Sequence, residues 1–114
     1  MLPKRSRLKI NRAQQFKWRD KKQIYTPLFK LVFHYSRNSP KPRIGFIVPG
    51  RIKGAVKRNR IRRLLTEAVK ERINKFPPDI EAILIANTEV EKATYEDVIT
   101  WINKIISKIH IPNE

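Results

Sequence analysis

The chain has 114 residues, of which 40% are apolar, with eight prolines and no cysteine. That length predicts one domain, residues 1–114, with a single hydrophobic core. The absence of cysteine excludes a disulfide framework, a thiolate zinc site and a cysteine nucleophile. No stretch reads as a signal peptide or a membrane span, because the apolar runs are short, and we expect a cytoplasmic protein.

Positive charge is concentrated in the first half of the chain. Residues 1–63 carry 20 Lys and Arg against one acid, a net charge of +19, whereas residues 64–114 carry six against nine, a net charge of −3. This segregation is typical of a surface that binds a polyanion and predicts a face that binds nucleic acid. A basic helix on a membrane surface is the main alternative. Such a helix needs exposed apolar side chains, and the apolar side of residues 56–73 is expected in the core.

The N-terminal part of the chain is predicted to form a basic arm followed by a short helix. Residues 1–10 hold four cations and little to bury, so they predict a flexible basic N-terminal arm. A short helix is predicted to begin after residue 11 and to end near residues 20–22, because an asparagine N-cap is followed by Gln14 in the capping-box position. Phe16 and Trp18 are two residues apart and cannot share a helical face. One of them is therefore a candidate for exposure, and the alternative is that both are buried.

Three later segments carry strand signals. Residues 28–35 alternate between two faces, which predicts a strand. Its apolar face holds Phe29, Leu31, Phe33 and Tyr35, and its mixed face holds Leu28, Lys30, Val32 and His34. Residues 36–42 predict a turn, and residues 43–49 predict a second strand, antiparallel to the first. Residues 80–86 form the most strand-like apolar run and predict a central strand.

Residues 51–75 predict one amphipathic helix that ends at Phe76, because two prolines follow. Its buried side is expected to comprise Val56, Ile61, Leu64, Leu65, Ala68, Val69 and Ile73. Its cations form an exposed stripe, Lys53, Lys57, Arg60 and Arg63, and a second row, Arg58 and Arg62. Between Gly50 and Leu65 there are seven cations and no acid. Such crowding is a cost at a helix N-terminus that a bound polyanion would offset, and the alternative is an ordinary solvated face.

The end of the chain predicts a last helix. Thr94 is its N-cap, and Asp97 lies in its first turn. Its buried stripe is expected to be Tyr95, Val98, Ile102, Ile105, Ile106 and Ile109. The predicted order is helix, strand, strand, helix, strand, helix. This order predicts an α+β fold in which three helices pack on a small open sheet.

No catalytic constellation is visible in the sequence. The basic half contains one acid, Asp20, and neither His34 nor His110 has a neighbour in sequence that orients it. No metal-ligand spacing, phosphate loop or nucleophile elbow occurs. The chain alone is therefore not expected to be catalytic, nor to bind a metal or a cofactor of its own.

The motif at residues 55–64, AVKRNRIRRL, resembles the signature of the protein subunit of bacterial ribonuclease P. Shorter matches extend the resemblance over residues 5–8, 43–48, 83–86 and 94–97. The resemblance implies a two-layer α/β sandwich, with a small, mostly antiparallel sheet of about four strands packed with three helices and a left-handed crossover around the basic helix. It also implies an accessory role beside a catalytic RNA that removes the 5′ leader of precursor tRNA with Mg²⁺, as one protein bound to one RNA.

The resemblance further implies roles for individual residues. The contacts to the catalytic RNA would be Arg51, Lys53, Lys57, Arg58, Asn59, Arg60, Arg62 and Arg63. The cleft for the single-stranded leader would be lined by Gln14, Phe16, Trp18, Lys30, Val32 and His34, with Gln14 where the family often has an aromatic residue. The alternative from another class is a ribosomal or general RNA-binding protein with no role in tRNA processing.

Overall fold

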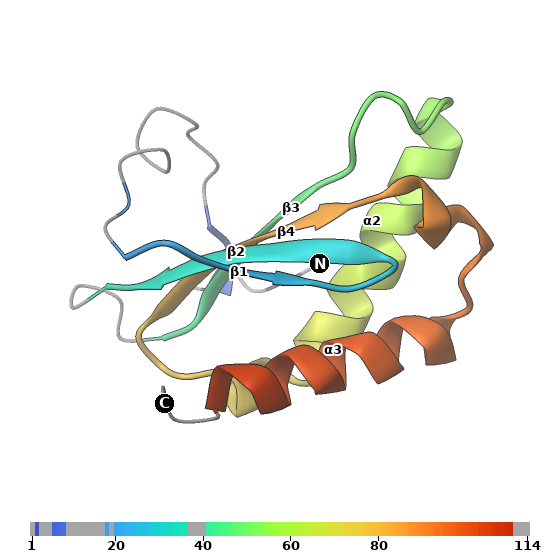
Figure 1. Ribbon diagram of the computed structural model, residues 1–114. Coiled ribbons are helices and arrows are strands. Elements are labelled where there is room, and N and C mark those ends of the chain that lie inside the picture. Colours follow the sequence, from blue (N-terminus) through green and yellow to red (C-terminus); the bar gives the residue numbers. More distant parts are fainter. Residues whose placement is uncertain (1, 3–5, 9–17, 19, 37–40, 111–114) are drawn as a thin grey trace.

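Two α-helices and four strands form the described part of the protein (Figure 1). The computed structural model describes residues 2, 6–8, 18, 20–36 and 41–110. The strands are β1 (Lys22–Tyr25), β2 (Phe29–Tyr35), β3 (Arg43–Ile47) and β4 (Ile80–Ala86). The α-helices are α2 (Ala55–Lys70) and α3 (Tyr95–His110), and two 3-10 helices, η2 (Ile73–Lys75) and η3 (Thr88–Lys92), follow α2 and β4.

The sheet is mixed, with the strand order β1-β2-β4-β3. β2 is antiparallel to both β1 and β4, whereas β3 is parallel to β4. The predicted antiparallel pairing of residues 28–35 with residues 43–49 is therefore wrong, because β4 lies between those two strands. As predicted, the apolar run at residues 80–86 occupies a central position. The helix α2 is the crossover that joins the parallel strands β3 and β4, as parallel pairing requires, and its left hand stays a prediction.

The sequence predicts three helices, and the structure corrects this number. Within the described residues there are two α-helices, on a four-stranded mixed sheet. Most of the predicted first helix, residues 11–17 and 19, lies outside the described residues. At its expected end, Asp20 has a φ of 52°, and β1 begins at Lys22. A helix can therefore not extend past Asp20, which lies at the earlier limit of the predicted end, and β1 is a strand that the sequence did not predict.

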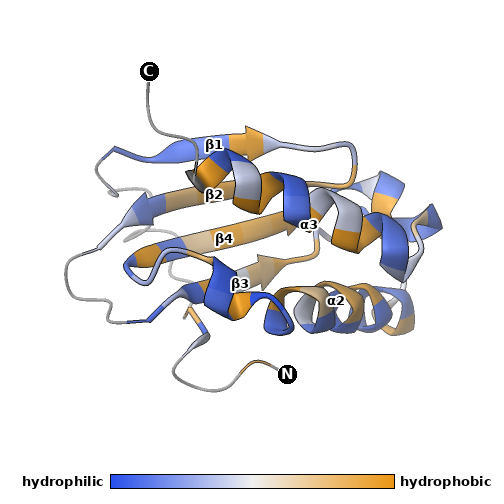
Figure 2. Cartoon of the chain, turned by 90° about the horizontal axis from the view of Figure 1, so that it is seen from below, coloured by the Kyte–Doolittle hydropathy of each residue, from blue (hydrophilic) through white to orange (hydrophobic). Residues whose placement is uncertain are grey.

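Both helices cover one face of the sheet, which gives the two predicted layers (Figures 1 and 2). The core lies between these layers. From the sheet it receives the predicted apolar face of β2, with Phe29, Leu31 and Phe33 all buried, whereas Tyr35 at the strand end is 43% exposed. From β4 it receives every second residue, because the register places Leu84 opposite Leu31 on the same face.

The helix α2 begins later than predicted, at Ala55. Gly54, its N-cap, has a φ of 93°, a left-handed conformation that glycine adopts without strain. The chain before it is therefore a turn, not helix. Val56 is 82% exposed, which corrects its predicted burial, because the whole segment 53–57 is exposed. Ile61, Leu65, Ala68 and Val69 are fully buried as predicted, whereas Leu64 and Ile73 are only partly buried. The predicted end at Phe76 is also wrong, because α2 ends at Lys70 and Ile73 lies in the separate 3-10 helix η2.

The helix α3 has the predicted cap. The Thr94 hydroxyl accepts from the Asp97 N–H at 3.2 Å, and the Asp97 carboxylate accepts from the Thr94 N–H at 3.0 Å. This reciprocal pair satisfies two donors at the helix start. The buried stripe contains Val98, Ile102 and Ile105 as expected. Neither described helix is long and apolar enough to cross a membrane, and the cytoplasmic location stays a prediction.

The described residues of the N-terminal arm lie along the outer edge of β3. Leu2 is buried, and Arg7 forms a parallel bridge with Ile44. The Leu8 N–H donates to the Ile44 carbonyl oxygen at 3.3 Å. One end of this edge strand is therefore covered, which protects it from pairing with other chains. The flexibility of the arm stays a prediction.

Candidate nucleic-acid interface

The cations predicted to contact RNA gather at the N-terminal end of α2. Of the eight predicted residues, five are exposed on the helix: Lys57, Asn59, Arg60, Arg62 and Arg63. Arg51 and Lys53 are exposed in the turn before it, and Arg58 is partly buried. The first turn of α2 contains no acid. The structure therefore brings together a cationic surface at a helix end that is already positive.

The guanidinium groups of this surface are held by neutral acceptors. The Arg58 Nη1 donates to the Ile52 carbonyl oxygen at 3.0 Å, which ties the preceding turn to the helix. The Arg62 Nη1 donates to the Asn59 Oδ1 at 3.2 Å. The Arg60 Nη2 donates to a backbone carbonyl oxygen, that of Glu91, at 3.4 Å. Such bonds orient the side chains without cancelling their charge.

One carboxylate reaches this surface. The Lys57 Nζ lies 2.8 Å from the Glu91 Oε1, and the two side chains are 48% and 29% exposed. Within the described residues, no carboxylate lies within 4.0 Å of the guanidinium groups of Arg58, Arg60, Arg62 and Arg63. The described acids of the second half of the chain therefore do not pair with these four arginines, which can form charge-assisted hydrogen bonds to an anion.

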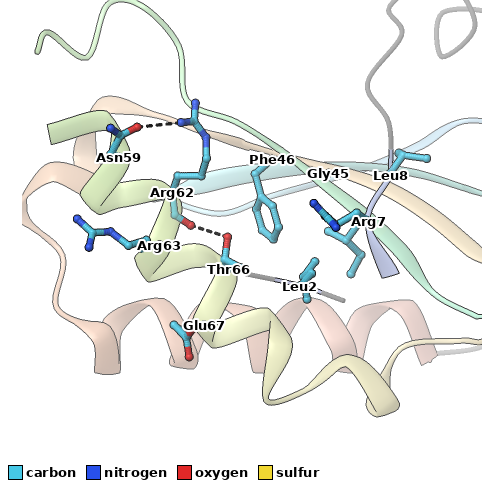
Figure 3. A pocket seen from close by; sticks show the side chains of 11 residues that line it. Leu2, Arg7, Leu8, Gly45, Phe46, Asn59, Arg62, Arg63, Thr66 and Glu67 are labelled. Atoms are coloured by element: carbon cyan, nitrogen blue, oxygen red, sulfur yellow. Dashed lines mark hydrogen bonds between the residues drawn. The ribbon is translucent and has the colours of Figure 1, made fainter. Parts of the chain in front are cut away.

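The arginines are displayed on both flanks of α2. On the β3 side, Arg62 and Arg63 line a cavity of about 660 Å³ (Figure 3). On the α3 side, Arg60 and Arg63 line a second cavity of about 550 Å³, together with Tyr95. Because Arg63 lines both cavities, it stands between the two flanks. An extended anion that crosses α2 can therefore meet several guanidinium groups in succession.

The predicted leader residues on β2 lie on the other face of the sheet, away from the helices. Lys30, Val32 and His34 are partly buried there. The register places them opposite Ile85, Ile83 and Glu81 of β4, respectively. This face therefore combines an apolar centre with polar groups at both ends of β2.

Trp18 covers one end of this face. Its ring is stacked on the imidazole of His34, with centroids 4.0 Å apart and an interplanar angle of 24°. The His34 Nε2 lies 2.8 Å from the Glu81 Oε1, and these two side chains are 13% and 17% exposed. His34 is thus a packed, hydrogen-bonded residue, as the sequence favours over a general base. Gln14 and Phe16 lie outside the described residues.

Two residues of this face, Glu81 and Tyr25, are not among those predicted to line the leader cleft. Glu81 orients His34 across the β2–β4 pair, and its signal is that it is the charged residue within an otherwise apolar strand. Tyr25 is 66% exposed, and the Lys30 Nζ lies 5.7 Å from the centroid of its ring. Tyr25 lies on β1, whose four residues, KQIY, are too few and too polar to carry a strong strand signal.

The described residues contain no evident metal-binding site. Among them, no three His, Asp or Glu side chains lie close enough together to hold a metal ion. Glu91, beside the cationic surface, is instead paired with Lys57, and Asp97 caps the start of α3.

Comparison with known proteins gives consistent matches. The family model described as Ribonuclease P matches residues 2–110. The ribonuclease P protein component of Finegoldia magna is 32% identical over 97 residues, which cover 85% of this chain and 84% of that protein. The one from Lactococcus lactis subsp. cremoris (strain MG1363) is 34% identical over 86 residues, 74% of this chain and 73% of that protein.

Solved structures match in fold. The RNase P protein of Staphylococcus aureus superimposes with a TM-score of 0.79 and 19% identity, over 95% of this chain and 98% of that chain. The RNase P protein of Thermotoga maritima gives a TM-score of 0.77 and 16% identity, over 94% and 98% of the two chains. At these identities the two structures support the fold alone.

Proposed function

The chain belongs to the ribonuclease P protein family, and on that premise we propose that it is the protein subunit of a bacterial ribonuclease P. In this role it binds the catalytic RNA and the 5′ leader of precursor tRNA, and it assists removal of the leader. The observation that carries the proposal is the set of α2 arginines that have no carboxylate partner among the described residues.

The α2 surface is proposed to bind the catalytic RNA. Arginine presents a planar fork that can grip phosphate with two hydrogen bonds. The surface is long enough to meet several phosphates, because its cations extend over both flanks of α2. Since Arg58 and Arg62 are already oriented by neutral acceptors, little side-chain freedom is lost on binding.

The helix-free face of the sheet is proposed to bind the leader. A single strand is held by stacking of its bases on aromatic rings and by cations along its backbone. Trp18 and Tyr25 supply rings, Lys30 supplies a cation, and Val32 supplies part of the apolar centre. Stacking tolerates any base, which suits leaders of different sequence.

The chemistry is proposed to belong to the RNA. Mg²⁺ would be held mainly by the RNA, because the described residues offer no group of carboxylates or imidazoles for it. The role of this chain is to place positive charge where two RNA molecules approach each other. Such charge lowers the repulsion between their phosphates and reduces the dependence of cleavage on added salt and Mg²⁺. A single protein bound to each RNA suffices for this role.

The test is cleavage of precursor tRNA by a bacterial ribonuclease P RNA, with and without this chain, at a low Mg²⁺ concentration. We expect the chain to raise the cleavage rate and to lower the Mg²⁺ concentration required. A polylysine of equal positive charge is the control for non-specific neutralisation. If the chain binds RNA but gives no gain over polylysine, a ribosomal or general RNA-binding role is favoured instead.

A further inference from the structure

The cavity between α2 and β3 has two unlike ends (Figure 3). Its volume is about 660 Å³, which is within the range of sites that hold small organic molecules. At one end lie Asn59 and Arg62, with Arg63 beside them on the next position of α2. Phe46 of β3 and Leu2 of the N-terminal arm line the other end, where the Arg7 side chain lies beside them.

The apolar end offers a flat ring and aliphatic neighbours. Phe46 is partly buried and packs against the core, and its side chain extends from β3 toward α2. Leu2 is 3% exposed. On the opposite wall, the Thr66 hydroxyl donates to the Arg62 carbonyl oxygen at 2.6 Å, which fixes its side chain. These groups give the cavity an apolar slot against which an aromatic ring can pack.

The polar end is continuous with the cationic surface of α2. The Arg62 guanidinium donates to the Asn59 amide oxygen at 3.2 Å, within the cavity wall. Within the described residues, neither Arg62 nor Arg63 is within 4.0 Å of a carboxylate. The Glu67 carboxylate lies one turn further along α2 than Arg63, and Arg7 is a third cation of the lining. An anion in the cavity is therefore favoured at these cations and away from Glu67.

The edge of β3 adds hydrogen-bonding groups. The Ile44 carbonyl oxygen accepts from the Leu8 N–H and therefore points away from β4. Because the direction of these groups alternates along a strand, the Phe46 N–H and carbonyl oxygen point to the same outer edge. No backbone bond between described residues outside the sheet uses them. A nucleobase that enters the cavity would meet this donor and acceptor.

We propose that this cavity holds one unpaired nucleotide of the RNA bound along α2. The base would lie on Phe46, with its edge toward the backbone of β3, and its phosphate would lie at Arg62 and Asn59. This assignment rests on the proposed function of α2 and deepens it. It requires that the RNA present a base at this cavity that is neither paired nor stacked within the RNA.

The two ends of the cavity argue for this occupant. A free phosphate ion would use Arg62 and leave the apolar slot filled with water. An apolar ligand would use the slot and leave the arginines without a partner. An RNA duplex keeps its bases stacked, whereas recognition of an unpaired base by a protein ring requires a single strand. A nucleotide is the unit of RNA that combines a flat ring with an anion, the two groups that the lining of this cavity would accept.

The test compares the affinity of the full chain for a bacterial ribonuclease P RNA, at several salt concentrations, with that of a Phe46→Leu variant. We expect the affinity to fall about tenfold, which is within the range for loss of one stacked base. The salt slope should stay unchanged, because no charge is removed. A Phe46→Tyr variant keeps the ring and should retain the affinity.

Phe76→Leu is the matched control, since Phe76 is 5% exposed and does not line the cavity. It should leave the affinity unchanged. If the wild-type chain binds RNA and Phe46→Leu binds equally well, this assignment is wrong and the proposed function stands. If the wild-type chain does not bind RNA, both fail. Should Phe46→Leu not fold, 5′-AMP added at millimolar concentration to the wild-type chain must shift the amide NMR signals of Gly45, Phe46 and Thr66. Unshifted signals contradict the assignment.

Discussion

The Lys57 ammonium group lies 2.8 Å from the carboxylate of Glu91. Among the described ion pairs, it is the one that joins the cationic surface of α2 to an acid of the second half of the chain. Glu91 also accepts a hydrogen bond from Arg60 through its backbone carbonyl oxygen. Two contacts therefore hold the 3-10 helix η3 against the start of α2. Only the ion pair neutralises a positive charge.

Glu91→Gln is expected to free Lys57 and to strengthen RNA binding. Because the pair is largely exposed, the free energy of unfolding should change by less than about 1 kcal/mol. The affinity for RNA should rise by about two- to fivefold at low salt, with a steeper salt dependence, since one carboxylate leaves the surface. Glu89→Gln, an exposed acid on the same 3-10 helix, is the control. Equal gains from both variants would argue against a role for the Lys57 pair.

Trp18→Ala is expected to weaken binding of the leader. Loss of one stacking ring is worth about 1–3 kcal/mol of binding free energy. The affinity for precursor tRNA, measured with the assembled ribonucleoprotein, should therefore fall, whereas the affinity for mature tRNA should not. Trp101→Ala, on α3, is the matched control, because Trp101 lies under Lys104 and away from this face of the sheet. A loss of affinity that is equal for both tRNAs would contradict the leader assignment.

Thr94→Ala is expected to lower stability without affecting RNA binding. The substitution removes the hydroxyl that accepts from the Asp97 N–H at the start of α3. The free energy of unfolding should fall by about 1 kcal/mol, as is usual for loss of an N-cap. Chemical denaturation would measure this value. A loss of RNA affinity in the folded variant would show that the start of α3 takes part in binding.

Tyr95 is expected to limit stability at alkaline pH. Burial, and then the nearby Glu71 side chain, raise the pKa of its phenol above the ordinary value. The folded protein thus favours the neutral phenol, and the stability linked to it is present at neutral pH and is lost as the pH rises through the raised pKa. Within the described residues its hydroxyl lacks a hydrogen-bond partner.

Tyr95→Phe should therefore leave the free energy of unfolding at neutral pH unchanged, or raise it by about 1 kcal/mol. Between about pH 9 and pH 11, the variant should lose less stability than the wild-type protein. Denaturation curves at a series of pH values measure this difference. Parallel losses in the two proteins would mean that the phenol does not titrate as described.

The elements that the sequence predicts well are those governed by local chemistry. The alternation of residues 28–35, the apolar run at residues 80–86 and the Thr94 cap each depend on residues that are close in sequence. Helical periodicity likewise predicts the buried side of α2 from Ile61 onward. It does not predict the exposure of Val56, because a period identifies a face but not where along the helix the core ends.

The elements that the sequence does not predict depend on distant contacts. The pairing of β3 with β4 rather than β2 is set by where α2 returns the chain. The His34–Glu81 contact joins residues 47 positions apart, and the cavity brings Phe46 next to Arg62 from separate elements. Neither contact leaves a periodic signal in the sequence.

The central claim is that the α2 arginines bind RNA phosphates, and it is tested most directly by the salt dependence of RNA affinity. For Arg60→Ala and Arg62→Ala, we expect weaker binding and a slope of log affinity against log salt that is smaller by about one. Lys108→Ala, an exposed cation on α3, should leave both unchanged. Slopes equal to that of the wild-type chain for both arginine variants would contradict the claim.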